Sequence, residues 1–203
     1  MDRMEGEPIQ GTTGDSMEPV LSSDGTWLAF FDLSGRKLKK IAVGGGSALT
    51  LAELPAATDG ASWHDSAIVF AMTEGSRSGI FTVPDRGGPP TQLVSLDASI
   101  ERASQPRLLP DGKHVLFTVR TPAGGAEGAI VVQSLDSGRR TTLVNGGASA
   151  RVLPTGQLVY LHDGALYAIP FNARTLDFTP SPALLVDDVL GTSGGQFAIS
   201  DNG

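Results

Sequence analysis

The chain has 203 residues, no cysteine, 40% hydrophobic residues and a formal net charge of −7. Its length allows one large or two small domains, and its apolar content is enough to bury a core. The lack of cysteine excludes disulfides, thiolate metal sites and cysteine nucleophiles. An acidic surface repels phosphate backbones, so nucleic acid is not an expected partner. No run approaches the roughly 20 apolar residues of a membrane helix, so we expect no direct membrane contact.

A short unit recurs along the chain, in which an apolar run meets a turn of the Asp-Gly kind. The turn residues of the five copies are Asp24, Asp65, Asp111, Thr155 and Asn202, which lie 41 to 47 residues apart. A period in the forties with four strands in each unit is the pattern of a β-propeller blade. The sequence therefore predicts an all-β, partial β-propeller with about four four-stranded blades and the first strand of a fifth.

The first copy shows the four expected strands most clearly. They are residues 18–22, 27–31, 38–43 and 48–51. Residues 27–31 are apolar at every position, which is typical of a strand covered on both faces. A two-sheet sandwich should instead alternate apolar and polar residues along a strand. This pattern favours the propeller.

The remaining copies place the other elements in one incomplete domain that spans residues 1–203. The expected blades are about 16–52, 59–95, 103–145 and 148–187, with a partial blade at 194–203 and a stray outer strand at 7–12. The weakly periodic stretch 96–104 is too short for a convincing helix and is assigned to a loop.

The motif Pro-x-x-Ser-x-Asp-Gly-x-x-Leu-x-Phe stands at residues 19–30, and a second instance stands at 106–117 with Leu109 at the Ser position and Val115 at the Leu position. This repeat resembles the TolB-type, WD-like propeller repeat. The fuller arrangement is similar to the C-terminal propeller of some bacterial serine/threonine kinases. Blade two departs from the motif with His64-Asp65-Ser66, and blade four with Pro154-Thr155-Gly156. The resemblance implies about six blades, a longer bacterial protein, and a periplasmic or otherwise extracytoplasmic location, although the chain shows no signal peptide.

No pattern for catalysis, a cofactor or a metal stands out. Residues 191–195 match the Gly-x-Ser-x-Gly pattern of a hydrolase, but a predicted strand follows where the nucleophile elbow requires a helix. His64, His114 and His162 fall in the turns of three different blades, whereas a zinc site needs ligands that converge. We therefore expect no catalytic residue, no cofactor, no metal and no enzyme activity in this chain.

The candidate binding residues lie on the first strand of each blade, because first strands line the axial channel of a propeller. They are Glu18, Ser62, Gln105, Arg107, Arg151 and Gln196. Arg107 and Arg151 occupy similar places in blades three and four. Two arginines that converge on an axis could hold a carboxylate or phosphate group. Pairing of both arginines with Glu18 or with local carbonyls is the alternative.

The sequence favours a non-enzymatic propeller fragment that presents a binding surface for a protein, a peptide or a small ligand. The alternative is a sensor or accessory domain of a bacterial serine/threonine kinase or of a serine peptidase, with the catalytic part outside this chain. An open ring of about four blades would expose apolar blade faces and strand edges. We therefore expect a homodimer or another closure through these faces.

Overall fold

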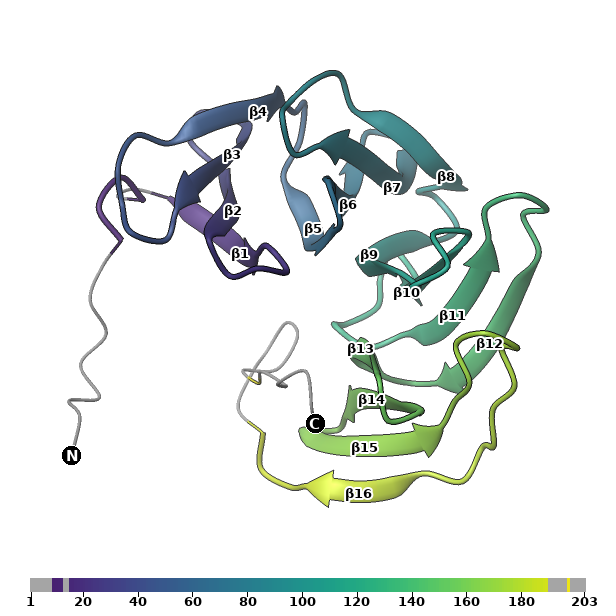
Figure 1. Ribbon diagram of the computed structural model, residues 1–203. Helices are drawn as coiled ribbons and strands as arrows, with labels where there is room; N and C mark the ends of the chain where they lie inside the picture. The colour runs from purple at the N-terminus through teal and green to yellow at the C-terminus, as the bar shows by residue number, and fades with distance from the viewer. Residues whose placement is uncertain (1–8, 13–14, 190–196, 198–203) are drawn as a thin grey trace, which may run out of the picture.

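The computed structural model describes residues 9–12, 15–189 and 197. These residues contain sixteen strands and no helix. Each run of four consecutive strands forms one antiparallel sheet in simple up-and-down order. The four sheets, called blades one to four in chain order, follow one another around an open arc (Figure 1). This confirms the predicted all-β, partial propeller. The predicted strand of a fifth blade at 194–203 lies, apart from Phe197, outside the described residues.

Strand lengths range from four to eight residues. In chain order the strands are β1 (Ser16–Leu21), β2 (Trp27–Asp32), β3 (Lys37–Ala42), β4 (Leu49–Glu53), β5 (Thr58–His64), β6 (Ala67–Glu74), β7 (Arg77–Pro84), β8 (Thr91–Asp97), β9 (Arg102–Leu108), β10 (His114–Arg120), β11 (Ala129–Ser134), β12 (Arg140–Asn145), β13 (Ala148–Leu153), β14 (Gln157–His162), β15 (Ala165–Pro170) and β16 (Ala183–Val186). β8 and β9 extend into the stretch 96–104 that was expected to be a loop, so only residues 98–101 connect them.

The Asp-Gly turns between first and second strands are held by the aspartate side chain. Asp24 Oδ1 accepts hydrogen bonds from the Ser22 hydroxyl at 2.6 Å and from the Thr26 amide at 3.0 Å. Asp111 Oδ1 accepts a hydrogen bond from the Lys113 amide at 2.9 Å in the equivalent turn. The glycine that follows each aspartate has a positive φ, +69° at Gly25 and +65° at Gly112, which a residue with a Cβ tolerates poorly. The Asp-Gly dipeptide therefore recurs because it forms this turn.

The apolar core lies between neighbouring blades, because the middle strands bury both of their faces. On β6, Ile68 and Phe70 pack in a cluster shared with blade one, and Val69 and Ala71 pack in a cluster shared with blade three. Successive side chains of a strand point to opposite faces, so each middle strand contributes to two interfaces. This explains why the second-strand sequences lack polar alternation.

The tryptophans and the tyrosines lie towards opposite ends of the arc. The Lys40 ammonium lies 4.6 Å from the ring centroid of Trp27 in blade one and 5.9 Å from that of Trp63 in blade two. This cation–π contact bridges the first pair of blades. In blade four, the rings of Tyr160 and Tyr167 stack with their centroids 5.9 Å apart.

The N-terminal segment differs from its prediction. The expected outer strand at 7–12 is, over its described residues 9–12, a turn in which the Thr12 amide and hydroxyl donate to the Ile9 carbonyl at 3.2 and 2.8 Å. Gly11 has a φ of +101°, and a Cβ there would lie 2.7 Å from Cδ1 of Ile41. The segment is a turn because Gly11 packs directly against blade one, where Ile41 is fully buried.

The second strands of the two end blades, β2 and β14, are largely buried. Phe30 of blade one is 4% exposed, and Val159 of blade four is 1% exposed. Val159 belongs to a small cluster to which Val189 and Phe197 contribute. The exposed apolar residues of blade four lie instead on β16, where all four side chains face solvent.

Candidate functional site

The first strand of every blade contains one residue in the left-handed region, at a β-bulge where the register shifts. These residues are Glu18 (φ 54°), Gly60 (φ 91°), Gln105 (φ 54°) and Ser149 (φ 55°). Only glycine adopts this conformation at little cost. Such bulges re-aim side chains, and the same local geometry recurs once in each blade.

These left-handed residues connect one blade to the next. Glu18 Oε1 accepts a hydrogen bond from the Gly60 amide at 2.7 Å, and Glu18 Oε2 accepts one from the Thr58 hydroxyl. Gln105 Oε1 accepts a hydrogen bond from the Ser149 amide at 2.5 Å. Between blades two and three the backbones themselves meet, since a Cβ on Gly60 would lie 2.5 Å from Cα of Gln105. Glu18 and Gln105 thus hold the blades together.

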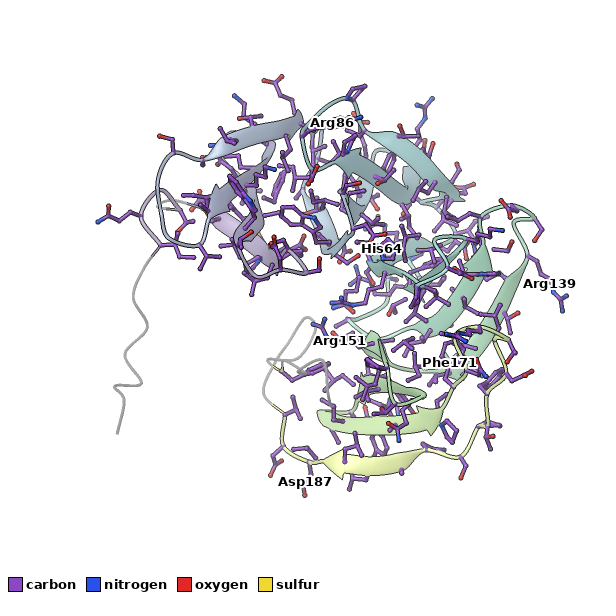
Figure 2. All side chains as sticks on the ribbon, in the orientation of Figure 1. His64, Arg86, Arg139, Arg151, Phe171 and Asp187 are labelled. Atoms are coloured by element: carbon purple, nitrogen blue, oxygen red, sulfur yellow. The ribbon has the colours of Figure 1, made fainter. Side chains whose placement is uncertain are left out.

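The same strands surround a cavity of about 700 Å³. Five of the six predicted binding residues line it: Glu18, Ser62, Gln105, Arg107 and Arg151. The sixth, Gln196, lies outside the described residues. Figure 2 shows Arg151 on the inner side of the arc. The structure thus brings together side chains from all four blades that are more than 130 positions apart in sequence at the extremes.

Two arginines give this cavity its electrostatic character. Burial lowers the pKa of Arg107 to about 9, with a second contribution from the positive charge of Arg151. Burial also lowers the pKa of Arg151, whose guanidinium carbon lies 5.4 Å from the ring centroid of Phe197. Both side chains remain protonated at neutral pH. Two partly desolvated positive charges therefore share one cavity.

Within the described part of the chain, neither arginine has a partner that would offset this charge. Among those residues, Arg107 and Arg151 form no ion pair and donate no side-chain hydrogen bond, and Nε of Arg151 is buried without a partner. The alternative pairing with Glu18 is not formed, because both Glu18 oxygens accept hydrogen bonds from blade two. The Ser62 hydroxyl, on a residue 4% exposed, likewise has no partner in the described ranges. Buried polar groups normally have one, so each of these groups requires an explanation.

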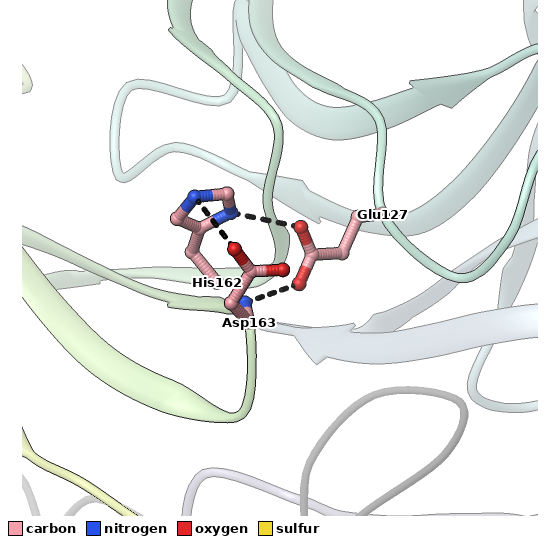
Figure 3. Close-up of side chains that lie close together, drawn as sticks. All are labelled: Glu127, His162 and Asp163. Atoms are coloured by element: carbon pink, nitrogen blue, oxygen red, sulfur yellow. Dashed lines mark hydrogen bonds and ion pairs between the residues drawn. The ribbon is translucent and has the colours of Figure 1, made fainter.

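A second cluster, Glu127, His162 and Asp163, was not anticipated from the sequence. Glu127 Oε2 lies 2.8 Å from Nδ1 of His162, and Glu127 Oε1 accepts a hydrogen bond from the Asp163 amide at 2.6 Å (Figure 3). One ligating atom from each residue lies within 4.8 Å of the others. Both Glu127 oxygens are already used within the cluster, however. We interpret it as a tie between the loop before β11 and the turn after β14.

A larger cavity of about 940 Å³ is lined by residues of blades three and four, with Phe171 and Phe178 among them. None of the buried polar atoms without a partner in the described part of the chain lies on its lining residues. It therefore offers apolar surface but no polar group that calls for a ligand.

No family model matches the chain, and a comparison with curated proteins finds no match. Solved structures do match. A TolB structure from Agrobacterium tumefaciens aligns with a TM-score of 0.63 and 15% identity, covering 90% of this chain and 71% of that one. TolB from Acinetobacter baumannii aligns with a TM-score of 0.59 and 16% identity, covering 79% and 41%.

A structure of a nidogen–laminin complex aligns with a TM-score of 0.63 and 11% identity, covering 83% of this chain and 63% of that one. The chain therefore spans less than two thirds of this neighbour and of the Acinetobacter TolB. At such low identities the similarity concerns the fold. The chain has the architecture of a β-propeller, with TolB proteins among its structural neighbours.

Proposed function

We propose that this chain is a non-enzymatic β-propeller domain that binds a protein, a peptide or a small ligand in the cavity between its first strands. The observation that carries the proposal is the convergence of Arg107, Arg151 and Ser62 on that cavity from three blades, where Arg151 Nε and the Ser62 hydroxyl are buried without a partner among the described residues. A volume of about 700 Å³ is in the range of ligand pockets. Ligand atoms would satisfy these groups where the protein does not.

The composition of the cavity supports binding in preference to catalysis. Nucleophilic catalysis needs a general base within hydrogen-bond reach of the nucleophile. Within the described residues, the Ser62 hydroxyl has no such partner and no histidine lines the cavity. The carboxylate of Glu18 is fixed by the Thr58 hydroxyl and the Gly60 amide.

The test is a thermal-shift screen, followed by calorimetry, against small organic acids, sugars, amines and short peptides. Val20→Trp should obstruct the cavity and abolish binding, because Val20 lines it. Leu33→Trp is the matched control, since Leu33 is 42% exposed in the same blade and does not line the cavity. Ligands that bind equally to both variants would contradict the assignment. Robust hydrolase activity that disappears in Ser193→Ala would refute the non-enzymatic role.

The finer role within a longer protein rests on the sequence motif. Its similarity to propellers of bacterial serine/threonine kinases supports a sensor or accessory domain and an extracytoplasmic location. No helix in the part of the chain that the structure describes has the length and apolar character to cross a membrane. The gene sequence on both sides tests this role. A kinase domain and a membrane helix upstream would support the sensor, and a serine-hydrolase domain downstream would support a peptidase accessory role.

A further inference from the structure

We propose that the cavity between the first strands binds its ligand through an oxyanion, a carboxylate or a phosphate group, held between Arg107 and Arg151. This inference deepens the proposed binding function and rests on it. It assigns the chemical class of the ligand and the residues that recognise it.

The charge balance of the cavity supports an anion. Its charged lining residues among those described are Glu18, Arg107 and Arg151, so one positive charge is in excess. The protein as a whole carries a net charge of −7, which makes this positive cavity a local exception. A single bound oxyanion would neutralise it.

Three other partly buried cations in the structure have carboxylate partners within the protein, whereas Lys40 lies over aromatic rings and Arg102 has no ion pair among the described residues. Arg140 Nη1 lies 2.8 Å from Oε2 of Glu101, Lys39 Nζ lies 2.6 Å from Oδ2 of Asp32, and Arg120 pairs with Asp59. Arg107 and Arg151 have none among the described residues, although burial disfavours the charged form of both and the charge of Arg151 further disfavours that of Arg107. Two partly buried arginines without a carboxylate partner in the described protein are suited to bind the carboxylate or phosphate group of a ligand.

The geometry of the donors also suits an oxyanion. A guanidinium presents N–H donors in a planar fork that matches the oxygens of a carboxylate or phosphate. Ser62 of blade two lines the same cavity, and its buried hydroxyl has no partner among the described residues. The volume exceeds that of a lone anion, and Trp63 is part of the lining. The oxyanion therefore belongs to a larger molecule, either a small organic acid or phosphate ester, or a peptide with an acidic group.

The test is isothermal titration calorimetry of the whole chain with inorganic phosphate, succinate and an acidic pentapeptide, each compared with succinamide as the uncharged probe. We expect at least one oxyanion probe to bind and succinamide not to bind. Arg107→Gln and Arg151→Gln should each weaken that binding about tenfold or more, as loss of a charged hydrogen bond does. Arg139→Gln is the matched control, because Arg139 is exposed and far from the cavity (Figure 2). The tighter of succinate and the peptide identifies the source of the oxyanion.

Arg107→Lys and Arg151→Lys keep the charge and remove the fork, and they serve if either glutamine variant fails to fold. They should bind less tightly than the wild type. The inference is overturned if no oxyanion probe binds, or if the glutamine and lysine variants of both arginines bind as the wild type does. Suppose instead that an uncharged ligand binds to the arginine variants but not to Val20→Trp. That result would leave the proposed function intact and refute the oxyanion inference. If every probe and ligand binds to Val20→Trp as it binds to the wild type, both the proposed function and the oxyanion inference are refuted.

Discussion

Blades two and three meet closely at Gly60, and substitution of this glycine tests whether their junction stabilises the arc of blades. In Gly60→Ala the new Cβ would lie 2.5 Å from Cα and 2.6 Å from N of Gln105. These are backbone atoms of blade three, so no side-chain rotation relieves the contact. The φ of +91° at Gly60 adds strain for any residue that has a Cβ.

The expected loss follows from these two contributions. The left-handed conformation costs a residue with a Cβ about 1 to 2 kcal/mol, and forcing an additional carbon into a packed contact costs about 1 to 3 kcal/mol. We therefore expect Gly60→Ala to lower the free energy of unfolding by about 2 to 5 kcal/mol. Gly112→Ala is the matched control, because Gly112 has a φ of +65° and a Cβ added there would have no heavy atom within 4 Å. It should lose only the conformational part, about 1 to 2 kcal/mol.

The assay is urea unfolding of the wild type and the two variants, followed by circular dichroism, with thermal melting as a second measure. For a chain of this size, 1 kcal/mol corresponds to about 2 to 4 °C in Tm. Equal losses in the two variants would refute the argument, because they would show that the approach of Gln105 to Gly60 contributes nothing beyond backbone conformation.

Two further predictions concern acid stability and assembly. Hydrogen bonds from the Ser22 hydroxyl, and then from the Thr26 amide and hydroxyl, lower the pKa of Asp24 from 3.8 to about 2, so the stabilisation is present above the ordinary pKa and is lost as the pH falls towards 2. Asp24→Ala should therefore melt at a lower temperature than the wild type at pH 7, and the difference should shrink as the pH falls from about 4 to 2. A difference of unchanged size at pH 2 would contradict this. We also propose that two copies associate through β16, whose Leu184 is 56% exposed on an edge strand. Light scattering should show a wild-type dimer and a monomeric Leu184→Lys variant, and a monomeric wild type would exclude the dimer.

The fold was predictable because its determinants are local and repeated. The Asp-Gly turns, the short apolar runs and their spacing each occupy a few consecutive residues, and every copy supports the others. The convergence of Arg107 and Arg151 was predictable for the same reason, since equivalent positions of consecutive blades lie side by side around an axis. Residues that repeat at the blade period in the sequence therefore lie close together in the structure.

The contacts that build the cavity wall could not be predicted in this way. Glu18, Gln105 and Ser149 adopt the left-handed conformation without the glycine that normally indicates it, and only Gly60 gives a local signal. Their partners lie 42 and 44 residues away. The outer strand predicted at residues 7–12 is a turn over its described residues 9–12, where the conformation depends on packing against blade one. Contacts of this kind are decided by tertiary structure, and short-range propensity does not show them.

The positions of the tryptophans and tyrosines allow the unfolding of the two ends of the arc to be followed separately by spectroscopy. Its two tryptophans, Trp27 and Trp63, share the Lys40 ammonium at the junction of blades one and two, and its two tyrosines, Tyr160 and Tyr167, stack in blade four. Indole fluorescence therefore reports on the first junction, and tyrosine absorbance reports on the opposite end of the arc. Coincident unfolding curves from the two chromophores would indicate one cooperative unit, and separated curves would indicate blades that detach in sequence.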